Sequence, residues 1–135
     1  MPKFKILPVR HGVVGREKTY LSIAAVTVEE GETEIVFPAY HEGEPITHIG
    51  YSEKFEEAHM RFHDWHHPAQ GEDYYPAAYS FRYERLNIPD TVERILIPET
   101  VTDVGYDAFY GVDPERIEID PKNTRLHRRK DGSIY

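Results

Sequence analysis

This sequence of 135 residues has the length of one domain, and its net charge of −8 argues against a general surface for nucleic acids or anionic membranes. Because cysteine is absent, the chain has no disulfides and no zinc sites with thiolate ligands. It has no apolar run of membrane length, and its first ten residues interleave charged and apolar side chains, unlike the core of a signal peptide. We therefore expect a cytoplasmic protein as the sequence stands, or a surface or secreted protein if a leader has been removed.

Residues 1–32 are predicted to form a cap of β-strands. Lys3–Leu7 alternates charged and apolar residues, and Tyr20–Val28 is a longer run of β-favouring side chains. We expect Pro8 to interrupt the first strand and His11–Gly15 to form the connecting loop. The first unit of a repeat array exposes an apolar edge, and a pair of strands can cover that edge. The residues after this cap indicate such an array.

The segment Arg10-His11-Gly12 resembles the signature of histidine phosphatases. The resemblance implies that His11 takes the phosphoryl group and that Arg10 binds it, which is nucleophilic catalysis by imidazole. We rank this enzyme hypothesis last, because Pro8 is expected to interrupt the strand that would deliver His11. The alternative is a surface loop.

Residues 33–50 are predicted to form a first repeat, and residues 51–83 a long insertion after it. Glu34–Pro38 reads as an alternating strand, and the segment that follows reaches a corner at Gly50. Apolar and histidine side chains then recur at helical spacing, so we expect an amphipathic helix over Glu53–His63. Insertions of this kind map to loops on one side of a solenoid, which is frequently the binding side.

The insertion holds half of the eight histidines of the chain. His59 and His63 are four residues apart on one face of the expected helix, and His66 and His67 follow shortly after. Imidazoles, with the neighbouring carboxylates, are suitable ligands for zinc or nickel. The alternative is that these histidines are solvated or packed against nearby aromatic rings.

Aromatic residues also concentrate in the insertion. Tyrosine and tryptophan bury a large area at a small cost in entropy, which suits a recognition surface. We therefore expect a partner to bind there, and we expect some of the same rings to be buried against the rest of the domain. The candidate binding residues are Trp65, Tyr74, Tyr75 and Tyr79.

Three copies of one phrase organise the rest of the chain. They are Glu84–Pro89, Glu93–Pro98 and Glu115–Asp120, each an alternating apolar strand that ends in a proline or an acid. From Ile97 to Ile119 is 22 positions, which lies within the roughly 20–29 residues of one leucine-rich repeat. The two isoleucines of each strand should point to the same face, into a stack.

The corners between the strands carry glycine and turn residues. Gly50 aligns with Gly105, and both are predicted to need a positive φ or a close approach of the backbone. Gly111 closes a short apolar turn. Pro89–Thr91 is predicted to make a tight turn between the two closely spaced copies.

These segments resemble the BspA-type leucine-rich repeat over residues 33–50 and 84–135. The motifs that carry the resemblance are Tyr40–Gly50, Ile97–Gly111, Ile117–Asn123 and Asp131–Tyr135. It implies a mainly β fold with short helical turns, arranged as a small solenoid that binds proteins, often on bacterial surfaces. It carries over no catalytic residues. Residues 1–135 would then be a single domain with an N-terminal strand cap, a first repeat, a partly helical insertion and the later repeats.

The C-terminal segment stops within the repeat pattern. Ile134–Tyr135 would leave an open strand edge, which favours a homodimer formed edge to edge. The basic cluster within Asn123–Lys130 is interpreted as a solvated loop. The sequence therefore predicts a non-catalytic protein-interaction module that binds through strand faces and the aromatic insertion, with a metal-binding module as the alternative.

Overall fold

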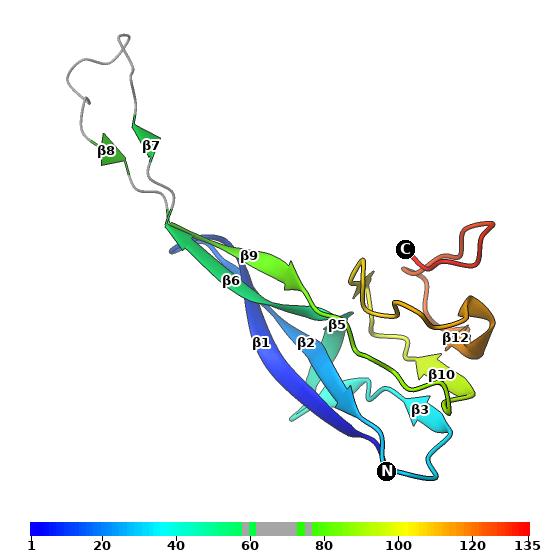
Figure 1. The fold of residues 1–135 in the computed structure, drawn as a ribbon. Helices are drawn as coiled ribbons and strands as arrows, with labels where there is room; N and C mark the ends of the chain where they lie inside the picture. The colour runs from blue at the N-terminus through cyan, green and yellow to red at the C-terminus, as the bar shows by residue number, and fades with distance from the viewer. Residues whose placement is uncertain (58–59, 62–72, 75–76) are drawn as a thin grey trace.

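The computed structural model describes residues 1–57, 60–61, 73–74 and 77–135, and its fold is mainly β, as predicted (Figure 1). No helix in these residues is long and apolar enough to cross a membrane. The strands are β1 (Lys3–Val13), β2 (Lys18–Thr27), β3 (Glu34–Val36), β4 (Tyr40–His41), β5 (Glu44–Ile49), β6 (Tyr51–Glu57), β7 (Met60–Arg61), β8 (Asp73–Tyr74), β9 (Ala77–Tyr83), β10 (Arg94–Ile97), β11 (Asp103–Val104) and β12 (Ile117–Ile119), and a 3₁₀ turn, η2, spans Pro114–Arg116.

Two of the three copies, as β10 and β12, form a parallel ladder with the first-repeat strand β3, in the order β12-β10-β3. Ile95 lies in register with Ile35 on one side and with Ile117 on the other, and Ile97 lies in register with Ile119. Ile35, Ile95 and Ile97 are fully buried, and Ile119 packs against the same core. The prediction that the two isoleucines of a strand share one face is therefore confirmed for β10 and β12, and that face is turned to the core.

A second parallel ladder places β5 between β2 and β11. β5 and β11 are each followed by a glycine, Gly50 and Gly105, where the backbones approach closely. The Gly50 N–H donates to the Ile23 carbonyl at 2.8 Å, and the Gly105 N–H donates to the Ile49 carbonyl at 2.7 Å. Gly50 has a φ of +81°, and a Cβ on Gly105 would lie 2.5 Å from the Gly50 carbonyl oxygen. Both corners require glycine, as the sequence predicts.

A buried asparagine, Asn123, ties the turn after β12 to the turn after β10. The Asn123 side-chain amide donates to the carbonyls of Pro98 and Val101, both at 2.9 Å. Its side-chain oxygen accepts from the backbone N–H groups of Arg125 and Leu126, at 2.9 and 3.0 Å. One side chain therefore makes four hydrogen bonds to backbone groups of two separate segments.

The N-terminal strands form the expected hairpin, with Lys3 opposite Thr27 and His11 opposite Lys18. The predicted interruption at Pro8 is wrong, because β1 continues through it to Val13. The Arg10 backbone N–H points away from β2 and donates to the Glu53 carboxylate at 3.0 Å. The nitrogen of Pro8, two residues earlier, faces the same side, where it has no ladder hydrogen bond to lose.

The predicted helix over Glu53–His63 is wrong wherever the structure describes it. Tyr51–Glu57 is strand β6, which pairs antiparallel with β9 from Tyr51 opposite Tyr83 to Glu57 opposite Ala77. Figure 1 shows this hairpin running away from β10 and β12. Rings on one face of the hairpin pack across the two strands, and the Phe55 and Tyr79 ring centroids are 5.0 Å apart. The alternation of side chains along a strand therefore decides the structure here, and the helical spacing of the apolar residues does not.

The phrase at Glu84–Pro89 does not form a strand, although its sequence matches the other copies. Leu86 is buried and donates its N–H to the Ala108 carbonyl at 3.0 Å, so the segment packs against the core as an extended connection. Asn87 has a φ of +53°, which breaks the extended backbone. The predicted turn after Pro89 is present, since the Val92 N–H donates to the Pro89 carbonyl.

Candidate functional site

Four exposed tyrosines gather where β9, the turn after β11 and the C-terminal segment meet. They are Tyr83, Tyr106, Tyr110 and Tyr135, with exposed fractions of 57%, 87%, 67% and 53%. We call these four residues the tyrosine surface. Tyr83 and Tyr106 have ring centroids 6.3 Å apart, so residues far apart in the sequence form one aromatic area.

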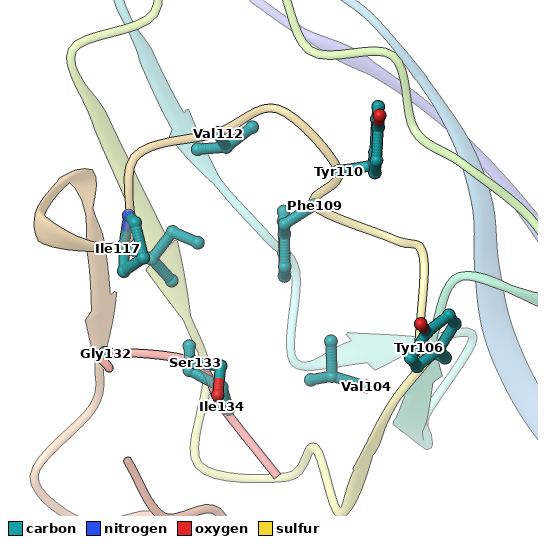
Figure 2. Close-up of a pocket in the computed structure, with 11 residues that line it drawn as sticks. Val104, Tyr106, Phe109, Tyr110, Val112, Ile117, Gly132, Ser133 and Ile134 are labelled. Atoms are coloured by element: carbon teal, nitrogen blue, oxygen red, sulfur yellow. The ribbon is translucent and has the colours of Figure 1, made fainter. Parts of the chain in front are cut away.

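The tyrosine surface borders a first pocket of about 210 Å³ (Figure 2). Its apolar lining comes mainly from Val104, Phe109, Val112, Ile117 and Ile134, together with the rings of Tyr106 and Tyr110. A pocket with apolar walls and aromatic neighbours is the usual form of a site that receives an apolar side chain.

A second pocket, of about 450 Å³, adjoins the first. The two share Val104, Gly105, Tyr106, Ser133 and Ile134 in their lining. The second pocket is more polar: three further tyrosines and two opposite charges complete its lining, namely Tyr51, Tyr83, Tyr135, Arg129 and Asp131.

Local backbone geometry explains why these rings face solvent. After Gly105 the chain makes tight turns, in which the Ala108 N–H donates to the Gly105 carbonyl and the Val112 N–H donates to the Phe109 carbonyl. Ala108 is buried and Phe109 packs on the core, whereas Tyr106 and Tyr110 lie on the outside of these turns.

A short hairpin presents the last tyrosine. His127 and Tyr135 exchange backbone hydrogen bonds of 2.9 and 3.0 Å, and the Arg129 N–H donates to the Ser133 carbonyl at 2.8 Å. Asp131 accepts from the Ser133 N–H at 2.9 Å and from its hydroxyl at 2.6 Å, which fixes the turn. The pKa of Asp131 is lowered, first by the Ser133 hydroxyl and then by its N–H, so this carboxylate stays ionised.

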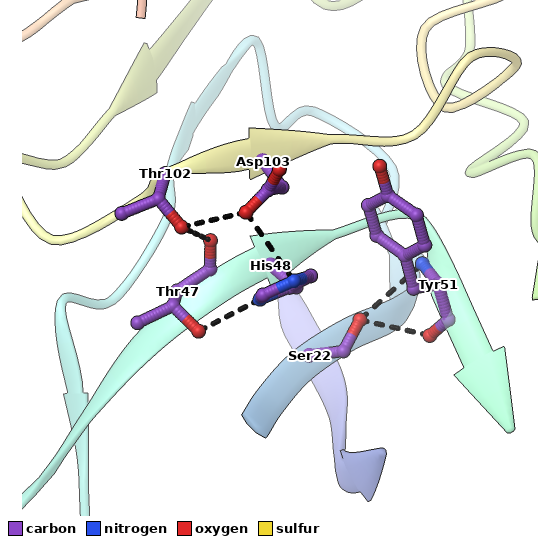
Figure 3. Close-up of polar contacts among 6 residues, drawn as sticks. All are labelled: Ser22, Thr47, His48, Tyr51, Thr102 and Asp103. Carbon is purple, nitrogen blue, oxygen red and sulfur yellow. Dashed lines mark hydrogen bonds and ion pairs between the residues drawn. The ribbon is translucent and has the colours of Figure 1, made fainter. Parts of the chain in front are cut away.

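A row of polar side chains, buried at Ser22 and His48 and exposed at Asp103, crosses three adjacent strands (Figure 3). Ser22, His48 and Asp103 stand in register on the adjacent strands β2, β5 and β11. His48 is only 3% exposed; its Nε2 lies 3.3 Å from Asp103 Oδ2 and its Nδ1 lies 2.7 Å from the Thr47 hydroxyl. Burial lowers the pKa of His48, and His11 lowers it further, while Asp103 opposes them.

The row has the residue types of a catalytic triad without its geometry. The Ser22 hydroxyl donates to the Tyr51 carbonyl at 2.8 Å and accepts from the Tyr51 N–H at 3.3 Å, and Ser22 is fully buried. A nucleophilic serine must instead bond to its histidine and reach solvent. The row therefore fastens β2 to the start of β6. Burial, followed by the charge of Asp103, raises the pKa of Tyr51 to about 12.

The residues of the phosphatase hypothesis are engaged elsewhere. The Arg10 guanidinium binds the Glu53 carboxylate through two contacts of 2.6 and 2.9 Å, and it lies 3.9 Å from the centroid of the Tyr79 ring. The His11 ring stacks on Phe81 at 4.5 Å. Glu53 neutralises the one cation that the hypothesis assigns to the phosphoryl group, so this geometry gives the hypothesis no support.

The predicted metal ligands His59, His63, His66 and His67 all lie outside the described residues. Among residues 1–57, 60–61, 73–74 and 77–135, no group of three or more histidines and carboxylates is placed to hold a metal ion.

The predicted partner-binding residues are placed only in part. Trp65 and Tyr75 lie outside the described residues, and Tyr74 belongs to β8, where only the backbone is described. Tyr79 is placed, and it is half-buried between Arg10 and Phe55.

Sequence reasoning missed the tyrosine surface, because Tyr106, Tyr110 and Tyr135 lie outside the insertion. A weak signal was present: Tyr106 follows a corner glycine and Tyr110 precedes one. The two pockets and the exposed rings are consequently the candidate site that the described residues support best. No protein-family model, curated protein or solved structure matches this chain.

Proposed function

We propose that this chain is a non-catalytic protein-binding module and that the tyrosine surface is its binding site. The observation that carries the proposal is the grouping of Tyr83, Tyr106, Tyr110 and Tyr135 around two adjoining pockets. Exposed tyrosines offer large, fairly rigid contact areas with a polar hydroxyl, which is why they are enriched at the centres of protein interfaces.

We propose further that the two parallel ladders are successive coils of a short leucine-rich-repeat solenoid. Three observations support this architecture: the isoleucines of the sequence copies stand in register, Gly50 and Gly105 occupy equivalent corners, and Asn123 bonds to backbone groups inside a turn. Solenoids of this kind carry their partners on surfaces formed by several coils. The tyrosine surface is likewise formed by several parts of the chain, since its rings come from separate turns.

The shape of the site favours a protein segment over a small metabolite. The first pocket is small and apolar, whereas the second is wider and lined by opposite charges. An extended peptide can place an apolar side chain in the first pocket and a polar one in the second. Interfaces commonly combine an apolar centre with a polar rim in this way.

The test is a selection of random peptides displayed on phage against the immobilised protein. Selected peptides are then measured on a Tyr83→Ala/Tyr106→Ala double variant and on a Tyr40→Ala variant. Tyr40 is a matched control, because it is 57% exposed, like Tyr83, and lines neither pocket. We expect the double variant to lose at least about tenfold in affinity and the control to lose little.

Two results would overturn the proposal. One is a selection that enriches no peptide over an uncoated surface. The other is a set of peptides that bind the double variant as tightly as the wild type.

A further inference from the structure

The second pocket has the walls of an aromatic cage. Tyr51 is its buried ring, and Tyr83 lies 5.5 Å from Tyr51 with the two ring planes inclined by 49°. Tyr106 lies 6.3 Å beyond Tyr83 at an inclination of 59°, and Tyr135 completes the lining. Inclined rings expose parts of several π faces to one volume, which suits a compact cation better than a flat ring.

The chain already places its own cations on tyrosines. Arg10 lies over Tyr79 at 3.9 Å, and Arg85 lies over Tyr110 at 4.0 Å. Tyr83 and Tyr106 have no such cation among the described residues, although both are more than half exposed. They are the rings of the tyrosine surface that remain open to an external cation.

The charges around the pocket also favour a cation. Asp131 lines the pocket as an ionised carboxylate, and Asp103 immediately precedes the lining residue Val104. The chain as a whole carries a net charge of −8, which attracts cations from solution. One group opposes them: Arg129 lines the same pocket, and its guanidinium lies 4.6 Å from the Tyr135 centroid.

We propose that the second pocket binds an alkylammonium group, as a lysine side chain of the protein partner carries it, in free or methylated form. The cation lies against Tyr83 and Tyr106, and Asp131 supplies the carboxylate side chain in the pocket lining. This inference rests on the proposed function, because the cation belongs to the partner. It adds the chemistry of the partner, namely a basic segment.

The probe is choline, whose quaternary ammonium group is an alkylammonium ion without a peptide. Its neutral isostere 3,3-dimethylbutan-1-ol has the same shape and no charge. Binding is followed by NMR, since aromatic ring currents move the methyl signals upfield. We expect choline to bind on the order of tenfold more tightly than the alcohol. Tyr106→Leu should abolish that preference, and Tyr106→Phe should keep it.

Two further variants should change choline affinity in opposite directions. Arg129→Gln removes the competing cation from the Tyr135 ring, so choline should bind about threefold more tightly. Asp131→Asn removes the negative charge and keeps an oxygen for Ser133, so binding should weaken about threefold. The backbone hydrogen bonds of the hairpin remain in both variants, which limits effects on folding.

The outcomes separate this inference from the proposed function. Equal binding of choline and its isostere, or a preference that survives Tyr106→Leu, overturns the cation site. If peptides still require Tyr83 and Tyr106 in that case, the binding module itself stands. Conversely, a choline preference that depends on Tyr106 supports the cation site even where peptide selection fails and overturns the proposed function.

Discussion

The parallel ladders and the β6–β9 hairpin are stabilised differently. In the ladders, isoleucines from β3, β10 and β12 are buried in one core. In the hairpin, Phe55 and Tyr83 remain more than half exposed, and stability comes from pairs of rings on one face. Burial of apolar side chains therefore stabilises the ladders, whereas contacts between rings on paired strands stabilise the hairpin. The two regions should respond differently to substitution.

The largest effect should follow Gly105→Ala in the ladders. The new Cβ would meet the Gly50 carbonyl oxygen at 2.5 Å, so β5 and β11 must separate, and we expect a loss of about 4 kcal/mol in the free energy of unfolding. Urea denaturation measures it. Gly43→Ala is the control: Gly43 has a φ of +83° with open space around it, and its loss should be about 1 kcal/mol. Equal losses would contradict the close packing of the two corners.

A second large effect is expected for Asn123→Ala. The substitution leaves two carbonyls and two N–H groups without their partner in a buried turn, which should cost about 3 kcal/mol. Thermal unfolding of this variant is compared with that of Thr124→Ala, whose side chain is exposed. A similar melting temperature for both variants would show that water replaces the asparagine.

The hairpin should show a smaller and more local effect. Phe55→Ala and Tyr79→Ala remove a partly exposed ring pair, and a double-mutant cycle should give a coupling of about 0.5–1 kcal/mol. Native-state hydrogen exchange should show faster exchange in β6 and β9, with β10 unchanged. Faster exchange throughout the chain would mean that the hairpin and the ladders unfold as one unit.

The smallest effect concerns pH and the contact between the two regions, where the His48 ring lies 5.2 Å from Phe81. Burial lowers the pKa of His48 below its usual 6.5, so near and below that pH the unfolded chain binds more protons than the folded one. The contribution of neutral His48 to stability is complete above pH 6.5 and is lost as the pH falls through the lower folded pKa. His48→Gln should therefore lose less stability than the wild type between pH 7.5 and 5. If the stability of the two proteins fell in parallel with pH, His48 would not be the origin of the pH dependence.

The sequence predicted the ladders well, because a repeated phrase shows which side chains share one face of a strand and how many residues separate successive strands. Ile95 and Ile117 occur in the same phrase and lie in register, and Gly50 and Gly105 align as equivalent corners. Glu84–Pro89 shows the limit of that signal. Its phrase is the same, but the positive φ of Asn87 and the packing of Leu86 depend on neighbours that are distant in the sequence.

The hairpin was mispredicted, because its apolar residues fit both the spacing of a helix and the alternation of a strand. Phe55, Ala58 and Phe62 fit a helix, but Tyr51 and Phe55 also fit a strand whose partner, Tyr79 to Tyr83, carries aromatic residues at every second position. Only the pairing of β6 with β9 decides between helix and strand. The tyrosine surface was missed for a related reason: exposure of Tyr106 is set by the turn that buries Ala108, which no local pattern in the sequence specifies.

The proline inside β1 has a consequence for aggregation. Over the described residues, β1 pairs with β9 only at Gly12 and Val13, so most of its outer side takes part in no strand pairing. Pro8 offers no N–H donor on that side, and another chain therefore cannot complete a hydrogen-bonded ladder there. Replacing Pro8 with valine would supply the missing donor in a long β-favouring strand. The residue that seemed to argue against a strand thus allows a long strand to exist without recruiting further copies of itself.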